Sequence, residues 1–160
     1  MTDVFAQIDI RKLQELREEN IGRLLLHAYR HFNTLAFDKL HARGHTGLGL
    51  NHAALLANLD IEGTRITVLA ERAGMTKQSM GELAQDLEQK GYIQRAADPV
   101  DKRATIIQFT EAGCRYLVDA YEIKQEIESE YAAVLGAGSM DQLRAFLKAL
   151  GESAPTGDNA

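Results

Sequence analysis

Apolar side chains recur every three or four residues along the first quarter of the chain, a spacing that predicts a long helix over residues 10–40. The side chains that fall on one side of this helix are Leu13, Arg17, Ile21, Leu24, Leu25, Ala28, Phe32 and Leu35. Glycines between residues 44 and 49 end the pattern and predict a loop. A second helix is expected over residues 50–59.

Beyond residue 63 the pattern predicts two short helices joined by a glycine turn. Thr64 is expected to cap the first helix and Gly74 to end it. Thr76 is expected to cap the second helix, which runs to Lys90, and Gly91 then stands where a left-handed residue ends a helix. This arrangement is typical of a helix-turn-helix.

Two strands are predicted next, over residues 92–95 and 104–109, with a polar hairpin tip over residues 96–103. A helix-turn-helix followed by such a hairpin is a winged helix-turn-helix, in which the second helix enters the major groove of DNA. The predicted fold class is therefore mainly α with a small β-hairpin wing.

Two more helices are expected after the hairpin. The first begins after a capping Thr110, and a capping box at residues 139–142 opens the second. Residues 152–160 are expected to form a flexible tail.

The predicted helix over residues 76–90 has two unlike sides. Its apolar side, which would dock it on its own domain, consists of Met80, Leu83, Ala84 and Leu87. Its polar side consists of Gln78, Glu82, Gln85 and Gln89. Glutamine can pair with adenine and glutamate with the cytosine amino group, while backbone N–H groups near Thr76 and Lys77 suit a phosphate. An ordinary solvated surface fits this side equally well, and Asp86 and Glu88 would repel DNA phosphates that they faced.

The hairpin tip reads Asp98-Pro-Val-Asp101-Lys-Arg103, which places Lys102 and Arg103 at the end of a projecting loop. An arginine there can reach into the narrow, negatively charged minor groove of DNA. Asp98 or Asp101 could hold that arginine by a charge-assisted hydrogen bond. A polar hairpin without a role in DNA binding is the alternative interpretation.

The stretch from Leu69 to Gly113 carries a specific resemblance. It reads LAERAGMTKQSMGELAQDLEQKGYIQRAADPVDKRATIIQFTEAG, with an MT turn, a helix ending in KGYIQR, a DPVDKR wing and a TEAG helix entry. This stretch resembles the multiple-antibiotic-resistance regulator (MarR) family throughout, and the flanking helices match the layout of that family.

The resemblance implies a transcriptional regulator, which we expect to be a repressor, acting as an obligate homodimer whose first and last helices interlock. Each subunit would meet one half of a palindromic operator in double-stranded DNA, and a small-molecule effector would weaken binding. The expected organisation is dimerisation helices at residues 1–48 and 110–151 around a winged helix-turn-helix DNA-binding lobe at residues 49–109.

The same resemblance implies which residues meet DNA. Lys77, Gln78, Ser79 and Glu82 would read or anchor in the major groove, and Arg103 would be the wing arginine. Members of the family often carry a basic residue where this chain has Glu82.

Charge and composition leave room for this function. The net charge of −5 argues against a protein coated in basic residues. Residues 64–115, however, carry eight Lys and Arg against seven Asp and Glu, a net of +1 that leaves −6 for the rest. No apolar run approaches the roughly 20 residues of a membrane span and no secretory signal is evident, so a cytoplasmic protein is expected. The sequence has no recognisable constellation of catalytic groups, so we expect no enzyme, no cofactor and no metal.

Two smaller signals stay open. His27 and His31 stand one turn apart, as some metal-binding pairs do, but their place beside the apolar side favours a polar role at a dimer interface or effector pocket. Cys114 near a helix start is compatible with a redox sensor, although a buried or half-buried structural cysteine is the simpler interpretation. The rival class of protein is a winged-helix protein–protein interaction module without DNA binding, which the acidic residues of the second helix favour.

Overall fold

The structure is a computed structural model that describes residues 9–136 and 138–152. Its elements are α1 (Ile10–Glu18), α2 (Ile21–Ala42), α3 (Leu50–Asn58), β1 (Thr64–Arg65), α4 (Ile66–Arg72), α5 (Lys77–Gln89), β2 (Ile93–Ala97), β3 (Thr105–Phe109), α6 (Glu111–Leu135) and α7 (Ser139–Glu152). The tail predicted at residues 152–160 lies, beyond Glu152, outside the described residues.

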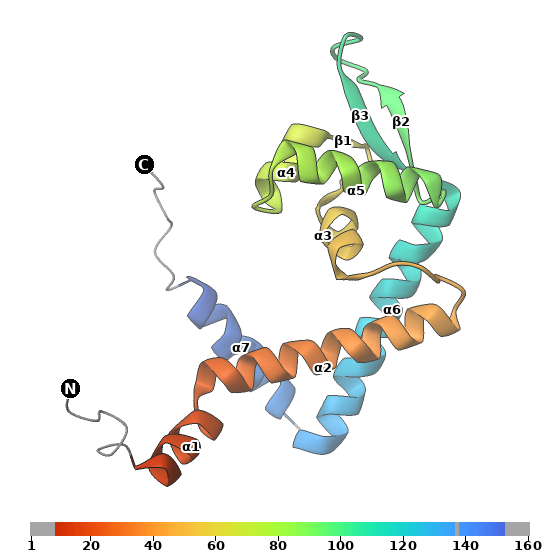
Figure 1. Cartoon of the computed structure of the whole chain (residues 1–160). Helices are drawn as coiled ribbons and strands as arrows, with labels where there is room; N and C mark the ends of the chain where they lie inside the picture. The colour runs from red at the N-terminus through yellow and green to blue at the C-terminus, as the bar shows by residue number, and fades with distance from the viewer. Residues whose placement is uncertain (1–8, 137, 153–160) are drawn as a thin grey trace, which may run out of the picture.

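The elements form a winged helix lobe and a set of long helices (Figure 1). The lobe comprises α3, α4, α5 and an antiparallel sheet in the order β1-β3-β2, and its β2–β3 hairpin projects as a wing. Helix α2 packs along α6, while α1 and α7 lie at the end of the molecule away from the wing. The fold is mainly α with a small sheet, which confirms the predicted class. No helix in the described part of the chain is long and apolar enough to cross a membrane.

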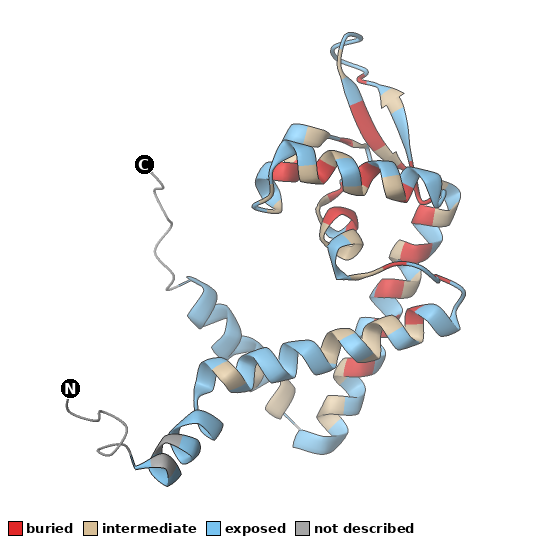
Figure 2. Cartoon of the chain, viewed as in Figure 1, coloured by how far each residue is buried: buried red, intermediate tan, exposed pale blue. Residues whose placement is uncertain are grey.

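One continuous hydrophobic core joins the lobe to the long helices. Its completely buried members are Leu55, Leu69, Met80, Ala84, Leu87, Ile123 and Ile127. They come from α3, α4 and α5 in the lobe and from the first two thirds of α6. In Figure 2 the buried residues gather here, whereas α1, the first half of α2 and α7 are largely exposed. The lobe therefore rests on α6, and the orientation of α5 depends on that packing.

The prediction of a single helix over residues 10–40 is wrong, because the chain breaks before α2. Asn20 has an extended backbone conformation and its side-chain oxygen accepts a hydrogen bond from the Arg23 N–H at 3.1 Å. Asn20 is thus an N-cap that starts a new helix. The apolar spacing continues across the break, so periodicity alone did not reveal it.

Thr64 does not cap a helix, which corrects a second prediction. It pairs with Ile107 in the short strand β1, and its hydroxyl is bonded to Asp60, accepting from the Asp60 N–H at 2.9 Å and donating to Oδ2 at 3.1 Å. Arg65 is the N-cap residue of α4. The wing therefore belongs to a three-stranded sheet and is braced by a strand that precedes the helix-turn-helix.

Side-chain caps are confirmed at two of the other three predicted positions. Thr76 accepts from the Ser79 N–H, and Thr110 accepts from the Gly113 N–H, both at 3.1 Å. The capping box at the start of the last helix is wrong, because Ser139 already lies within α7 and its hydroxyl donates to the Leu135 carbonyl at 2.9 Å.

Candidate nucleic-acid interface

Helix α5 buries its apolar side and exposes its polar side, as the sequence predicts. Met80, Ala84 and Leu87 have no exposed surface, and Leu83 is partly buried. The exposed side carries Gln78, Glu82, Gln85 and Gln89. Burial of this apolar side fixes which side of α5 faces away from the protein, since Met80 and Leu87 each contribute about 1.5–3 kcal/mol when removed from water.

The residues expected to meet the major groove occupy the first two turns of α5. Thr76 caps the helix, and its hydroxyl lies 2.9 Å from that of Ser79, so both hydroxyls are used in shaping the helix start. Lys77 is exposed in the first turn, where N–H groups can hold a phosphate. The Gln78 amide donates to Glu82 Oε1 at 3.2 Å, so these two polar side chains lie against each other one turn apart.

Two acidic side chains of α5 are paired within the protein. Asp86 accepts from the His52 ring at 2.6 Å and from the Lys90 ammonium, and the Lys90 and His52 bonds lower the pKa of its carboxyl. Glu88 accepts from Arg95 Nε at 3.0 Å. These pairs offset the negative charge that the sequence places on this helix and weaken the reason for expecting repulsion of DNA.

The wing turn is organised around the nearly buried carboxylate of Asp98. Its Oδ1 accepts from the N–H groups of Val100 and Asp101 at 2.8 and 3.2 Å, and its Oδ2 accepts from Arg65 Nε at 2.7 Å. The Val100 N–H and the Arg65 guanidinium hold the pKa of this carboxyl below its usual range. Arg65 thus ties the wing to β1.

Neither aspartate of the wing holds the Arg103 side chain, in contrast to the prediction. Asp98 is committed to Arg65, and Asp101 Oδ1 accepts from the backbone N–H of Arg103 at 3.1 Å. The Arg103 guanidinium makes no hydrogen bond or ion pair with any residue that the structure describes. Both aspartates shape the turn through the backbone and leave an exposed guanidinium at the wing tip.

Arg65 and His52 are contributors that the sequence did not reveal. Arg65 meets Asp98 across 33 positions of the chain and His52 meets Asp86 across 34. Neither pair forms a local motif. The only signal available was the presence of acidic residues on the helix and the wing, each of which needed a partner if it was to be partly buried.

Cys114 and His31, the smaller candidates, differ in how they are placed. Cys114 is exposed, so the interpretation as a buried or half-buried structural cysteine is wrong. His31 Nδ1 lies 2.9 Å from the Tyr131 hydroxyl and its ring stacks on that tyrosine, which gives it a partner on α6. Among residues 9–136 and 138–152 no group of three or more side chains has the geometry of a metal site.

This geometry defines a winged helix protein with an outward-facing polar helix and a basic wing tip, a class that reads double-stranded DNA. Comparison with known proteins shows which family this region resembles. A sequence profile of the MarR family matches residues 46–104, the region that contains the helix-turn-helix and most of the wing. Over this region the chain matches the MarR family, and the curated relatives that it resembles are named transcriptional regulators.

Individual relatives agree with this resemblance. The chain is 29% identical to the transcriptional regulator HosA of Escherichia coli O111:H- over 97 residues, which cover 61% of this chain and 70% of HosA. Its fold is similar to that of CouR from Rhodococcus jostii RHA1, solved bound to p-coumaroyl-CoA, with 25% identity, a TM-score of 0.66, and coverage of 88% and 96% of the two chains. E. coli MarR in its apo form, 18% identical, has the same fold, with a TM-score of 0.64 over 81% of this chain and 96% of that one.

Proposed function

We propose that this regulator binds a palindromic operator as a homodimer and represses transcription in the cytoplasm until a small molecule releases it. The observation that carries the proposal is the exposed polar side of α5, whose acids at 86 and 88 have partners within the protein, together with the unpartnered Arg103 guanidinium on the wing. Lys77, Gln78 and Glu82 would meet the major groove, with Thr76 and Ser79 forming the helix start. Arg103, with Lys102 beside it, would enter the minor groove.

Selection of bound duplexes from random DNA, followed by fluorescence anisotropy, tests this proposal. The protein should enrich a palindromic sequence, and its affinity should fall steeply with added salt, because each phosphate contact releases counterions. Absence of binding at low salt, or binding that does not respond to salt, would count decisively against it.

The wing contributes a prediction of its own. Arg103→Ala should weaken binding about tenfold or more while the protein stays folded and its oligomeric state is unchanged. Arg30→Ala, which removes an exposed arginine from α2 far from the wing, is the matched control and should leave affinity unchanged. Equal affinities of the Arg103→Ala variant and the unaltered protein would remove the wing from the mechanism.

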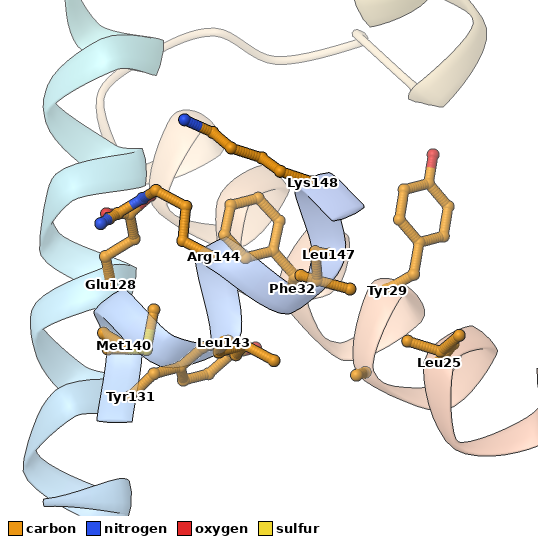
Figure 3. Close-up of a pocket in the computed structure, with 11 residues that line it drawn as sticks. Leu25, Tyr29, Phe32, Glu128, Tyr131, Met140, Leu143, Arg144, Leu147 and Lys148 are labelled. Atoms are coloured by element: carbon orange, nitrogen blue, oxygen red, sulfur yellow. The ribbon is translucent and has the colours of Figure 1, made fainter. Parts of the chain in front are cut away.

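The homodimer is supported by the apolar surface at the end of the molecule opposite the wing. Exposed apolar side chains gather there on α1, α2 and α7, namely Leu16, Ile21, Leu24, Leu25, Leu26, Tyr29, Phe146 and Leu147. They continue into a groove of about 640 Å³ between α2, α6 and α7, around which Leu25, Phe32, Tyr131, Leu143 and Leu147 lie (Figure 3). An apolar patch of this kind marks an interaction site, and we assign it to a second copy of the chain. Two copies would need to present their α5 helices about 34 Å apart to read successive major grooves.

An effector site is supported by a small pocket in the crevice between the long helices and the lobe. Phe37 and Leu40 of α2, Leu56 of α3, and Tyr116 and Ala120 of α6 are among the residues that line it. Its volume is about 100 Å³, below the usual range for ligand sites, so an effector must widen it by separating α3 from α2 and α6. Because α3 packs on α5, such widening would move the DNA-reading helix.

The ligand of a similar protein supplies the first probe for this pocket. CouR was solved with p-coumaroyl-CoA, so this compound and simpler aromatic acids are the starting set. A true effector should raise the melting temperature of the free protein and lower its DNA affinity, and both effects should disappear in Ala57→Phe, which places an aromatic ring at the rim. A compound that changes the melting temperature and the DNA affinity of Ala57→Phe as much as those of the unaltered protein binds elsewhere. If every effector behaves in this way, this pocket is not the effector site.

The alternative of a winged-helix protein–protein module has lost much of its basis. It rested on Glu82, Asp86 and Glu88. Asp86 and Glu88 are paired within the protein, whereas Glu82 accepts from the neutral Gln78 amide. The module would still be favoured if no duplex were enriched and a protein partner covered the exposed side of α5.

A further inference from the structure

A single histidine on α3 holds one of the acidic side chains of the DNA-reading helix. His52 lies in the first turn of α3, and its ring reaches across to Asp86 on α5, with Nε2 2.6 Å from Asp86 Oδ2. The His52 side chain is only 16% exposed, compared with 40% for Asp86. The bond therefore joins two helices at the edge of the core and holds the Asp86 carboxylate against α3.

The proton on the His52 ring is placed by the backbone. The Gly49 N–H donates to Nδ1 at 2.9 Å, and because a backbone N–H can only donate, Nδ1 must carry a lone pair. The neutral ring then has its hydrogen on Nε2, which donates to Asp86. Gly49 is thus the reason that His52 presents a donor, and not an acceptor, to α5.

The place of Asp86 on α5 makes this bond relevant to DNA. At 100° per residue, Asp86 lies about 40° around the helix from Glu82, at the edge of the exposed polar side. If the Asp86 carboxylate lost its bond to His52, it could turn toward the phosphates that flank the major groove. The negative charges of the carboxylate and the phosphates would then repel each other.

Lys90 also pairs with Asp86, but it cannot replace His52. Lys90 stands four residues after Asp86 at the end of α5, so their bond moves with the helix and leaves the carboxylate unattached to the rest of the lobe. The Lys90 side chain is 30% exposed, and its long flexible stem allows the ammonium to turn to a DNA phosphate. His52 is the partner of Asp86 that belongs to another element.

We propose that His52 is a positioning residue for DNA recognition, which holds the Asp86 carboxylate against α3 and away from the DNA phosphates. The inference rests on the proposed function, since it assigns a role within DNA binding. It explains how this chain tolerates an acidic residue at the edge of its recognition helix.

Two substitutions of His52 separate its two hydrogen bonds. In His52→Asn the side-chain oxygen can still accept from the Gly49 N–H, but the amide is too short to reach Asp86. In His52→Gln the longer amide can donate to Asp86 in place of Nε2. Both side chains are polar and smaller than, or similar in size to, the imidazole, so the pair is matched for folding. Melting temperatures of the free proteins check that match.

The experiment is a double-mutant cycle with Asp86→Asn, measured by fluorescence anisotropy on a duplex selected with the unaltered protein. His52→Asn should weaken binding about fivefold at low salt, because a single unshielded charge near the phosphates costs about 1 kcal/mol. The slope of log affinity against log salt should become shallower by up to about one, because one phosphate contact is offset. His52→Gln should stay within about twofold of the unaltered protein. In the Asp86→Asn background, His52→Asn should have no further effect.

The outcomes that overturn the inference are distinct from failure of the proposed function. An equal loss from His52→Asn with and without the Asp86 charge would show that His52 acts only through the structure of α3. Unchanged affinity and an unchanged salt slope in His52→Asn would show that Asp86 needs no restraint. If the unaltered protein enriches no duplex at all, the proposed function fails and this inference fails with it.

Discussion

Among the glycines in the described part of the chain, Gly113 has the least room for a side chain. It lies in the first turn of α6, and a Cβ atom built on it would stand 2.0 Å from the Tyr92 carbonyl oxygen and 2.9 Å from Phe109 Cδ1. The Tyr92 carbonyl also accepts from the Thr110 N–H at 3.1 Å, so it cannot simply withdraw. The glycine of the TEAG segment is therefore required where the wing meets the long helix.

Gly113→Ala should consequently destabilise the protein strongly. We expect a loss of about 3 kcal/mol or more in the free energy of unfolding, measured by urea denaturation, since overpacking against backbone cannot be relieved by a rotamer change. Gly81→Ala on α5 is the control: its Cβ would meet no described atom within 4 Å, and it should raise stability by about 0.5–1 kcal/mol. Similar stabilities for the two variants would contradict this account of Gly113.

Local side-chain roles were predictable from the sequence, and distant ones were not. Thr76 and Thr110 cap helices by bonding to an N–H three residues ahead, so the sequence contains all that the bond needs. The Arg65–Asp98 and His52–Asp86 pairs depend on how strands and helices meet in space. Because these pairs decide which charges reach the DNA side, the electrostatics of the site could not be derived from spacing.

At the scale of elements, the parts with strong hydrophobic periodicity were predicted well. Helix α5 and its buried side follow from apolar residues spaced three and four positions apart. Strands β2 and β3 were predicted from the segments on either side of the polar turn. β1 was missed because two residues carry no periodicity and are defined only by pairing with Ile106 and Ile107. The break before α2 was missed because the apolar pattern continues across Asn20.

Helix α6 is the element that connects the DNA-reading lobe to the opposite end of the molecule. Its first half is buried with the lobe through Tyr116, Ala120 and Ile123. Asp119 accepts from Arg43 at 2.7 Å and pairs with the nearly buried His45 at 2.8 Å, and His45 also lies 3.2 Å from the Tyr92 hydroxyl. The end of α2, the base of the wing and α6 are thereby tied together. A change in the position of α6 must therefore also move the base of the wing.

At the scale of the whole molecule, burial is strongly asymmetric. The lobe and the adjoining half of α6 are well packed, whereas no described residue of α7 is buried and Leu40 alone is buried in α2 (Figure 2). Amphipathic helices that expose this much apolar surface are stable only against a partner. The division into dimerisation helices and a DNA-binding lobe stays a prediction, and the oligomeric state is its test.

Phe146→Glu should disrupt the proposed homodimer, because it places a charge in the exposed apolar surface of α7. Phe146 is 66% exposed in the single chain, so the substitution does not disturb the core of one subunit. If Phe146 is a central contact, its loss should weaken dimerisation about 100-fold, as measured by light scattering across a concentration series, and should weaken binding to the full operator with it.

The matched control is Ile61→Glu, which makes the same kind of change at a residue that is 69% exposed between α3 and β1 in the winged helix lobe. It should leave dimerisation unchanged. If the unaltered protein is monomeric at micromolar concentration, or if both variants dimerise equally well, α7 is not part of the interface and the apolar groove beside it needs another occupant. Dissociation in Phe146→Glu alone, with operator affinity lost in parallel, would show that both subunits must be held together for the two recognition helices to reach successive major grooves.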